Sequence, residues 1–229
     1  MHFLSVARPP DSMAFLPMIR ALLALGKGAT KGLPNLTEAD DPIAFFQRWF
    51  SDARRAGIFL PESMSLATAT RDGKPGGRMV LLKGVDQRGF VFYTNHDSRK
   101  GRELTDNPRA ALTLHWALLE RQVRVEGPVT QLPRAEAEAY FRTRPRGSQL
   151  GAWASMQSAV LENRRVLESK FREVERTYAG RDVPLPDFWG GWRVEPEVIE
   201  FWQGRLDRLH DRVCYTRDGT GWRVTRLYP

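Results

Sequence analysis

The chain has 229 residues, of which 41% are hydrophobic and 27% are charged. This composition supplies a sizeable core and excludes disordered, collagen-like and coiled-coil classes. The single cysteine, Cys214, excludes an internal disulfide framework and a cysteine-based zinc site, so we expect a cytoplasmic protein. A net charge of +8 favours anionic partners without choosing among nucleic acid, an anionic membrane and phosphorylated small molecules.

The first 41 residues differ in character from the rest of the chain. Met13–Leu25 is apolar enough to suggest the core of a signal peptide, but Pro17 and Arg20 interrupt it and it is too short to span a bilayer. We therefore predict a flexible or lid-like N-terminal extension over residues 1–41. Residues 42–229 show no linker and no internal repeat, which predicts one α+β domain.

The domain begins with a predicted helix over Pro42–Gly57. Asp41 is a suitable N-cap and Pro42 suits the first helical position. Apolar residues then recur at spacings of three and four, which indicates a face packed on the core: Ile43, Phe46, Trp49 and Phe50.

Alternating residues from Ser63 onward predict strands joined by short turns. The turns fall at residues 71–76 and 86–89, and a short helical segment precedes the strands of residues 109–116 and 120–132. Helices follow over residues 133–143 and 159–178, the second with Ser158 as its N-cap. Three further strands are predicted over residues 190–204, 205–219 and 220–229. The spacing favours an antiparallel, closed or partly closed β-barrel with flanking helices.

Standard catalytic motifs are absent from the sequence. It contains no P-loop, GxGxxG, HExxH, GxSxG or CxxC, and its four histidines are too scattered for a helical metal pair. We predict no metal site.

Two helix starts have the composition of an anion site. Asp97 or Ser98 can cap a short helix whose first amides lie beside Arg99 and Lys100, which suits a phosphate. Gln157 and Ser158 precede the later helix in a similar way. As isolated patterns, both are more typical of ordinary solvated helix starts.

Two other groups could also bind an anion. Tyr140 and Arg144 are one helical turn apart, and Pro145 ends that helix and leads to Ser148; a solvated helix end is the alternative. Arg208, His210 and Arg212 alternate, so on a strand they project from one face, either into an anionic-substrate site or into solvent.

Arg78 and Lys83 are five residues apart, which places them on opposite faces of a regular strand. They serve one site only if a bulge or a subunit interface intervenes.

Several segments together resemble the pyridoxamine 5′-phosphate oxidase family of FMN-dependent split-barrel flavoproteins. They are RMVLLK, VFYTNHDSRKGREL, LERQVRVEG, RPRGSQLGAWAS, QS, FWGGWR and FWQGRLDRLHDR, in this order. The resemblance implies an antiparallel split β-barrel with flanking helices and a homodimer with FMN at its interface. The family's Arg-x-x-Tyr lid pair has no counterpart here, where residues 23–32 read LALGKGATKG.

The resemblance also implies roles for individual residues. FMN would be held from one subunit by Arg78, Met79, Val80, Leu81, Leu82, Lys83, Tyr93, Thr94, Arg99 and Lys100, and from the other by Gln122, Gln157, Ser158, Trp202 and Arg212. The substrate phosphate would be held by Lys83, Tyr140, Arg144 and Ser148. Arg208 and His210 would lie against the pyridine ring as catalytic residues.

The implied reaction oxidises pyridoxamine or pyridoxine 5′-phosphate to pyridoxal 5′-phosphate. FMN takes a hydride from C4′ and O2 accepts the electrons as H2O2. A split-barrel flavoprotein of different substrate specificity is the alternative. We expect no nucleic-acid partner, because no RNP, KH or helix-turn-helix signature accompanies the basic charge. We expect no membrane partner either.

Overall fold

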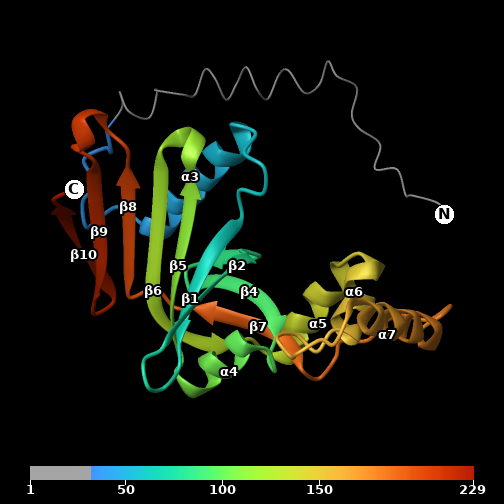
Figure 1. Ribbon diagram of the computed structural model, residues 1–229. Coiled ribbons are helices and arrows are strands. Elements are labelled where there is room, and N and C mark those ends of the chain that lie inside the picture. The colour runs from blue at the N-terminus through green and yellow to red at the C-terminus, as the bar shows by residue number, and fades with distance from the viewer. Residues whose placement is uncertain (1–31) are drawn as a thin grey trace, which may run out of the picture. The chain divides into compact units, whose positions relative to one another are not determined.

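The computed structural model describes residues 32–229 and divides them into two compact units (Figure 1). Unit 1 contains residues 32–63, 113–124 and 198–229, and unit 2 contains residues 64–112 and 125–197. The division falls within strands β5 (Arg109–Trp116) and β6 (Arg121–Gln131). Within residues 32–229, no helix is both long and apolar enough to cross a membrane.

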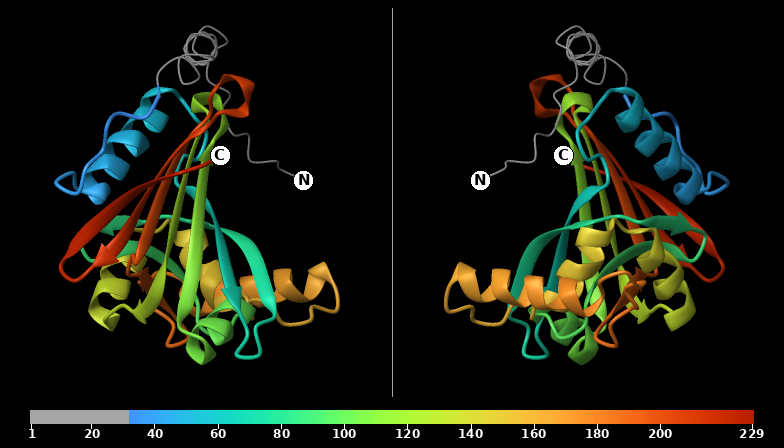
Figure 2. Two further views of the ribbon diagram at one scale, coloured as in Figure 1. Left: turned by 90° about the vertical axis from the view of Figure 1, so that its left-hand side faces the viewer. Right: turned by 90° about the vertical axis from the view of Figure 1, so that its right-hand side faces the viewer.

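Unit 1 is built around helix α3 (Pro42–Arg55), which confirms the first predicted helix. Asp41 caps it, since its Oδ1 accepts a hydrogen bond from the Ile43 amide at 2.8 Å. Of the predicted apolar face, Ile43, Phe46 and Trp49 are buried and Phe50 is half-buried. The rings of Phe45 and Trp49 lie 4.6 Å and 5.4 Å from that of Phe201 on β8 (Val198–Gln203). Burial of these aromatic side chains fixes α3 against the strands of unit 1. Figure 2 shows the helix lying along these strands.

The strands of unit 1 follow the order β10-β9-β8-β6. β9 (Asp211–Asp218) and β10 (Gly221–Leu227) form an antiparallel hairpin, and β9 also pairs with β8. Short 3-10 turns lie at Ala117–Leu119 and Leu206–Arg208.

Residues 32–41 of the predicted extension pack on the strands of unit 1. The Leu33 amide donates to Asp211 Oδ2 at 3.1 Å, and Leu36 is buried. Residues 1–31 of that extension, with the signal-like stretch and the segment at the expected lid, lie outside the described residues.

Unit 2 contains the rest of the strands. β1 (Ser63–Ala69) lies between β2 (Pro75–Leu81) and β5, and β4 (Gly89–Asn95) lies between β3 (Gly84–Asp86) and β7 (Trp189–Val194), which also pairs with β6. The β3–β4, β4–β7 and β6–β7 pairs are antiparallel. Every residue of β7 is buried.

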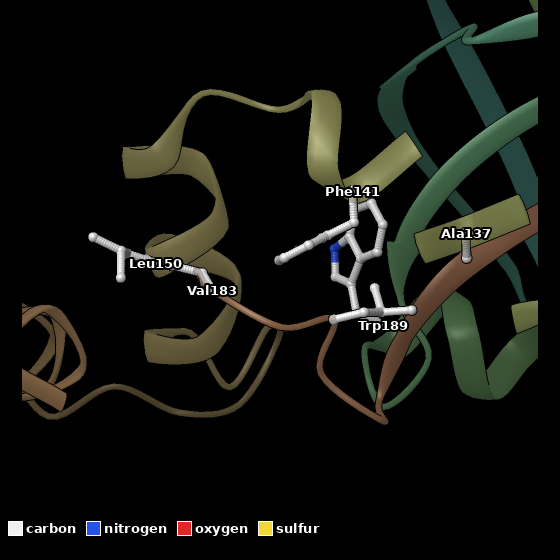
Figure 3. Close-up of a cluster of buried hydrophobic side chains, with 6 residues drawn as sticks. Ala137, Phe141, Leu150, Val183 and Trp189 are labelled. Carbon is white, nitrogen blue, oxygen red and sulfur yellow. The ribbon is translucent and has the colours of Figure 1, made fainter. Parts of the chain in front are cut away.

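Four helices complete unit 2: α4 (Arg99–Asp106), α5 (Arg134–Thr143), α6 (Arg146–Ala154) and α7 (Arg164–Thr177). Phe141 of α5 packs against Trp189 at a ring separation of 5.2 Å, within a buried cluster that includes Leu150 and Val183 (Figure 3). This cluster anchors α5 and α6 to the start of β7.

Three sequence-based boundaries were wrong. α7 begins at Arg164 with Asn163 as its cap, because Ser158 has a φ of 72°, outside the extended region of an N-cap. The strand predicted over residues 190–204 is two strands, interrupted around Pro196, which has no amide to donate. Arg208, with a φ of 60°, lies in a 3-10 turn, so it does not share a strand face with Arg212.

We predict that Gly101→Ala lowers the free energy of unfolding by about 1–3 kcal/mol. A Cβ at this helical position would lie 2.0 Å from the His96 carbonyl oxygen, so α4 would have to move. The matched control is Gly151→Ala in α6, where a Cβ meets nothing within 4 Å. It should raise stability by about 0.5–1 kcal/mol. Urea denaturation followed by circular dichroism tests both, and equal effects of the two substitutions would contradict the prediction.

Candidate functional site

A cavity of about 580 Å³ in unit 2 gathers most of the residues predicted from the sequence. It is lined from β2, β4, the first turn of α4, the end of α5 and the loop before α7. The lining residues are Gly77, Arg78, Met79, Val80, Leu81, Lys83, Tyr93, Thr94, Arg99, Lys100, Tyr140, Arg144, Gln157, Ser158 and Trp189. All except Gly77 and Trp189 are residues that the sequence singled out.

Arg78 and Lys83 reach this one cavity from a single chain. β2 ends at Leu81, and the amide of Lys83 donates to the Val91 carbonyl at 2.8 Å. Lys83 therefore lies beyond the regular strand, where alternation of faces no longer applies. The bulge or subunit interface expected from the five-residue spacing is not needed.

Lys100 is a buried cation whose side-chain acceptors are all neutral. Ser98 caps α4, and Lys100 Nζ donates to Thr94 Oγ1 at 2.9 Å, Ser98 Oγ at 3.2 Å and Gln157 Oε1 at 2.9 Å. Burial and, to a smaller extent, the nearby charge of Arg78 lower the pKa of Lys100 to about 8, although Glu103 opposes the shift. A bound anion would supply the negative charge that these acceptors lack.

Glu103, one turn further along α4, organises the arginines of the same region. Its buried carboxylate pairs with Arg78 Nη2 at 2.9 Å and Arg99 Nε at 2.7 Å, and accepts a hydrogen bond from the Thr68 hydroxyl. Burial raises the pKa of Glu103, but hydrogen bonds from Thr68, Arg99 and Arg78 outweigh it and bring the value to about 2. Glu103 was not identified from the sequence. Its position four residues after Arg99 on a predicted helix would have indicated an ion pair between the two side chains.

An aromatic stack lines another part of the cavity. The rings of Tyr93 and Tyr140 are 4.0 Å apart and inclined by 13°, and Trp189 lies within 7° of parallel to both. Arg144 Cζ lies 4.6 Å from the Trp189 ring centroid, and burial lowers the pKa of Arg144. Its Nη1 is buried without a hydrogen-bond partner. The guanidinium of this cavity-lining residue therefore has a donor without a hydrogen-bond partner.

Two predicted residues in unit 2 lie elsewhere. Leu82 is buried away from the cavity lining, and Ser148 is exposed on α6. Gln157 and Ser158, expected from a second subunit, line the cavity together with Thr94 of their own chain, which donates to Gln157 Oε1 at 3.0 Å.

The remaining predicted residues belong to unit 1: Gln122, Trp202, Arg208, His210 and Arg212. The ring of His210 lies 4.7 Å from that of Trp202, and its Nδ1 accepts from the Arg205 amide at 3.1 Å. Arg212 is held by Glu200 through contacts of 2.8 Å and 3.1 Å, and its pKa is raised by these hydrogen bonds. Arg208 is exposed.

A second cavity of about 770 Å³ in unit 2 shares Arg144 but is otherwise lined by different residues. Its arginines have structural partners: Arg146 donates to the carbonyls of Tyr178 and Arg181, and Arg142 pairs with Glu138. The smaller cavity is therefore the candidate site.

The lining residues are of the types that suit two oxyanions beside a flat aromatic surface. One cationic group surrounds Lys100 and the other contains Arg144, and both face the same cavity. Within residues 32–229, no cluster of three or more His, Cys, Asp or Glu side chains could hold a metal ion.

Two family models match the chain. The model described as pyridoxamine 5′-phosphate oxidase matches residues 50–178, and the one described as the pyridoxine 5′-phosphate oxidase C-terminal dimerisation region matches residues 189–229.

Curated relatives are similar over most of the chain. The pyridoxine/pyridoxamine 5′-phosphate oxidase of Rubrobacter xylanophilus is 61% identical over 82% of this chain and 87% of its own. That of Psychromonas ingrahamii is 52% identical over 95% of this chain and 100% of its own.

Solved structures share the fold. PhzG from Burkholderia lata 383, in complex with tetrahydrophenazine-1-carboxylic acid, has a TM-score of 0.80 at 35% identity, over 86% of this chain and 99% of its own. A pyridoxamine 5′-phosphate oxidase-related, FMN-binding protein from Nostoc punctiforme has a TM-score of 0.67 at 16% identity, over 83% of this chain and 100% of its own. The expected α+β split-barrel fold class is confirmed.

Sulfate binding at the cavity is predicted to weaken as the pH rises above 8. The pKa of Lys100 is about 8, so its charge is lost there while sulfate keeps its own. We expect affinity to fall by up to about tenfold per pH unit. Calorimetric titration of ligand-free protein from pH 7 to pH 10 measures this. The Lys100→Met variant should bind sulfate more weakly, with an affinity that does not change over this pH range. A wild-type affinity that does not change with pH would refute the prediction.

Glu103→Gln is predicted to lower the free energy of unfolding at pH 7 by roughly 3 kcal/mol. The carboxyl pKa is about 2 when folded against 4.5 unperturbed, so its contribution is complete above pH 4.5 and is lost as the pH falls toward 2. The difference between wild type and variant should therefore shrink at pH 3 in urea titrations. Glu138→Gln, which removes the exposed pair with Arg142, is the control and should cost less than about 1 kcal/mol at either pH.

Proposed function

Because the chain belongs to the pyridoxine/pyridoxamine 5′-phosphate oxidase family, we propose that the unit 2 cavity holds cofactor and substrate together. The enzyme is an FMN-dependent oxidase of pyridoxine 5′-phosphate and pyridoxamine 5′-phosphate. One observation carries the proposal. Two separate cationic groups face a single cavity, and both FMN and its substrate end in a phosphate. The product is pyridoxal 5′-phosphate.

The group around Lys100 fits the phosphate of FMN. Arg78 and Arg99 are preoriented by Glu103, and the Lys100 ammonium has only neutral oxygens as partners. Gln157 and Ser158 line the same region, and residues 78–81 with Lys83 would border the flavin ring. When bound, FMN accepts a hydride from the substrate and passes the electrons to O2, which gives H2O2.

Arg144 and Tyr140 fit the substrate phosphate, with Lys83 as a second cation. The Arg144 guanidinium has a buried, unpartnered Nη1, and Lys83 lines the same cavity. By holding this phosphate, they would restrict where the reacting carbon of the substrate lies, which is the protein's main contribution to hydride transfer. Ser148 is exposed and does not line the cavity, so its proposed contact with the substrate phosphate rests only on the family resemblance.

Arg208 and His210 would bind the pyridine ring and its reacting substituent. His210 Nδ1 accepts a hydrogen bond from the Arg205 amide. The neutral form of the imidazole therefore carries its proton on Nε2 and can donate a hydrogen bond from that atom. We assign the pair to orientation and polarisation of the substrate.

We further propose that the enzyme is a cytoplasmic homodimer in which each site is completed by the partner subunit. The dimerisation region matches residues 189–229, which include Leu206 and Leu209, each 69% exposed, and Tyr228, 94% exposed. Exposed apolar side chains of this kind favour burial against a second copy. Unit 1 of the partner subunit would supply Gln122, Trp202, Arg208, His210 and Arg212.

Hybrid dimers test this arrangement. Lys100→Met and Arg208→Ala chains, carrying different affinity tags, are coexpressed, and dimers with both tags are isolated. Each parent should be poorly active, whereas the hybrid should regain about half of the wild-type activity, because one of its two sites receives no substitution. Bleaching of the flavin band by pyridoxine 5′-phosphate without oxygen, and its return in air, measures the active sites. A hybrid as inactive as its parents would show that each site is built from one chain.

A further inference from the structure

We propose that Trp189 is a positioning residue that holds Arg144 ready for the substrate phosphate and so sets the preference for phosphorylated over unphosphorylated substrates. This inference rests on the proposed role of Arg144 in phosphate binding. Trp189 lines the cavity but is only 8% exposed, so it acts mainly through the side chains that it contacts.

Arg144 is held by aromatic faces instead of a carboxylate. Its Cζ lies 4.6 Å from the Trp189 centroid and 5.4 Å from that of Phe141, and it makes no ion pair with a carboxylate within residues 32–229. An aromatic face attracts a guanidinium through the ring quadrupole and leaves its net charge in place. A carboxylate partner would neutralise that charge and compete with the phosphate. The arrangement therefore keeps Arg144 fixed in position while its full charge and the unpartnered Nη1 remain for the ligand.

Trp189 also aligns Tyr140, the other proposed phosphate contact on α5. The two rings are 6.2 Å apart and inclined by 7°, and Tyr93 stacks on Tyr140 at 4.0 Å. One indole therefore contacts both the guanidinium and the phenol stack that face the substrate half of the cavity.

The local sequence of β7 explains why the stack forms. In the β4–β7 register, Trp189 faces Asn95 and Gly191 faces Tyr93. A Cβ at residue 191 would lie 2.8 Å from Tyr93 Cε1, so glycine leaves the space that the Tyr93 ring occupies. Trp189 and Gly191 share one face of the strand, which brings the indole alongside that ring. The Phe141 side of the indole is buried in the cluster drawn in Figure 3, so its orientation is fixed from both sides.

The test compares Trp189→Leu, Trp189→Phe and the control Trp153→Phe in the FMN-loaded enzyme. Trp153 is also in unit 2 but packs on Tyr178 and Phe188, outside the cavity lining. Trp189→Leu should raise KM for pyridoxine 5′-phosphate about tenfold, with kcat and FMN affinity changed less than about threefold. Trp189→Phe retains an aromatic face and should stay within about threefold of wild type, as should the control. The ratio of kcat/KM for pyridoxine 5′-phosphate to that for pyridoxine should fall with Trp189→Leu.

A double-mutant cycle with Arg144→Ala decides whether Trp189 acts through Arg144. The Trp189→Leu, Arg144→Ala double variant should have nearly the KM of Arg144→Ala alone, because the tryptophan then has no guanidinium to hold. Additive increases in KM would overturn the inference while leaving Arg144 as a phosphate ligand. An unchanged KM in Arg144→Ala would overturn the assignment of Arg144 and the inference with it. Loss of kcat alone, or equal damage from Trp153→Phe, would mean that Trp189 is only structural.

Discussion

The site depends on cations that are buried or fixed without being neutralised. Lys100 is surrounded by hydroxyl and amide oxygens, and its pKa of about 8 reflects the free energy of keeping an ammonium out of water. Arg78 and Arg99 share one carboxylate, that of Glu103, so two guanidiniums are oriented while one positive charge remains. The region therefore carries a positive charge that an anionic ligand can offset.

The aromatic part of the cavity achieves a similar result by different means. Arg144 lies against Trp189 and Phe141, whose ring faces hold a guanidinium without cancelling its charge. Two phosphate positions in one cavity can thus differ in character, because one is hydrogen-bonded and polar whereas the other is flanked by rings. This difference would suit an enzyme that must keep its cofactor and release its product, since the proposed cofactor site has more preoriented donors than the proposed substrate site.

Local sequence patterns were sufficient for most of the elements, though not for α6, and for much of the site. Asp41 and Pro42 predicted the start of α3, and the alternation after Ser63 predicted the strands, because caps and periodicity act over a few residues. The same patterns failed at Ser158, Pro196 and Arg208, where unusual backbone conformation or a missing amide interrupts a segment that is otherwise regular. The basic start of α4 was identified correctly, but Glu103 was missed because two of its three partners, Arg78 and Thr68, come from strands distant in the sequence.

The sequence by itself determined the family, the elements and the residue types that can bind phosphate, since these follow from short motifs and local spacing. Only the tertiary structure decided which of these residues meet. It brought Arg78, Lys83, Lys100, Arg144 and Gln157 into one cavity, left Ser148 outside it and added Trp189. The physical reason is that burial and long-range pairing set both the contacts and the charge state of such groups. The β4–β7 register places Tyr93 over Gly191, and the packing of Gln157 on Lys100 removes that ammonium from water.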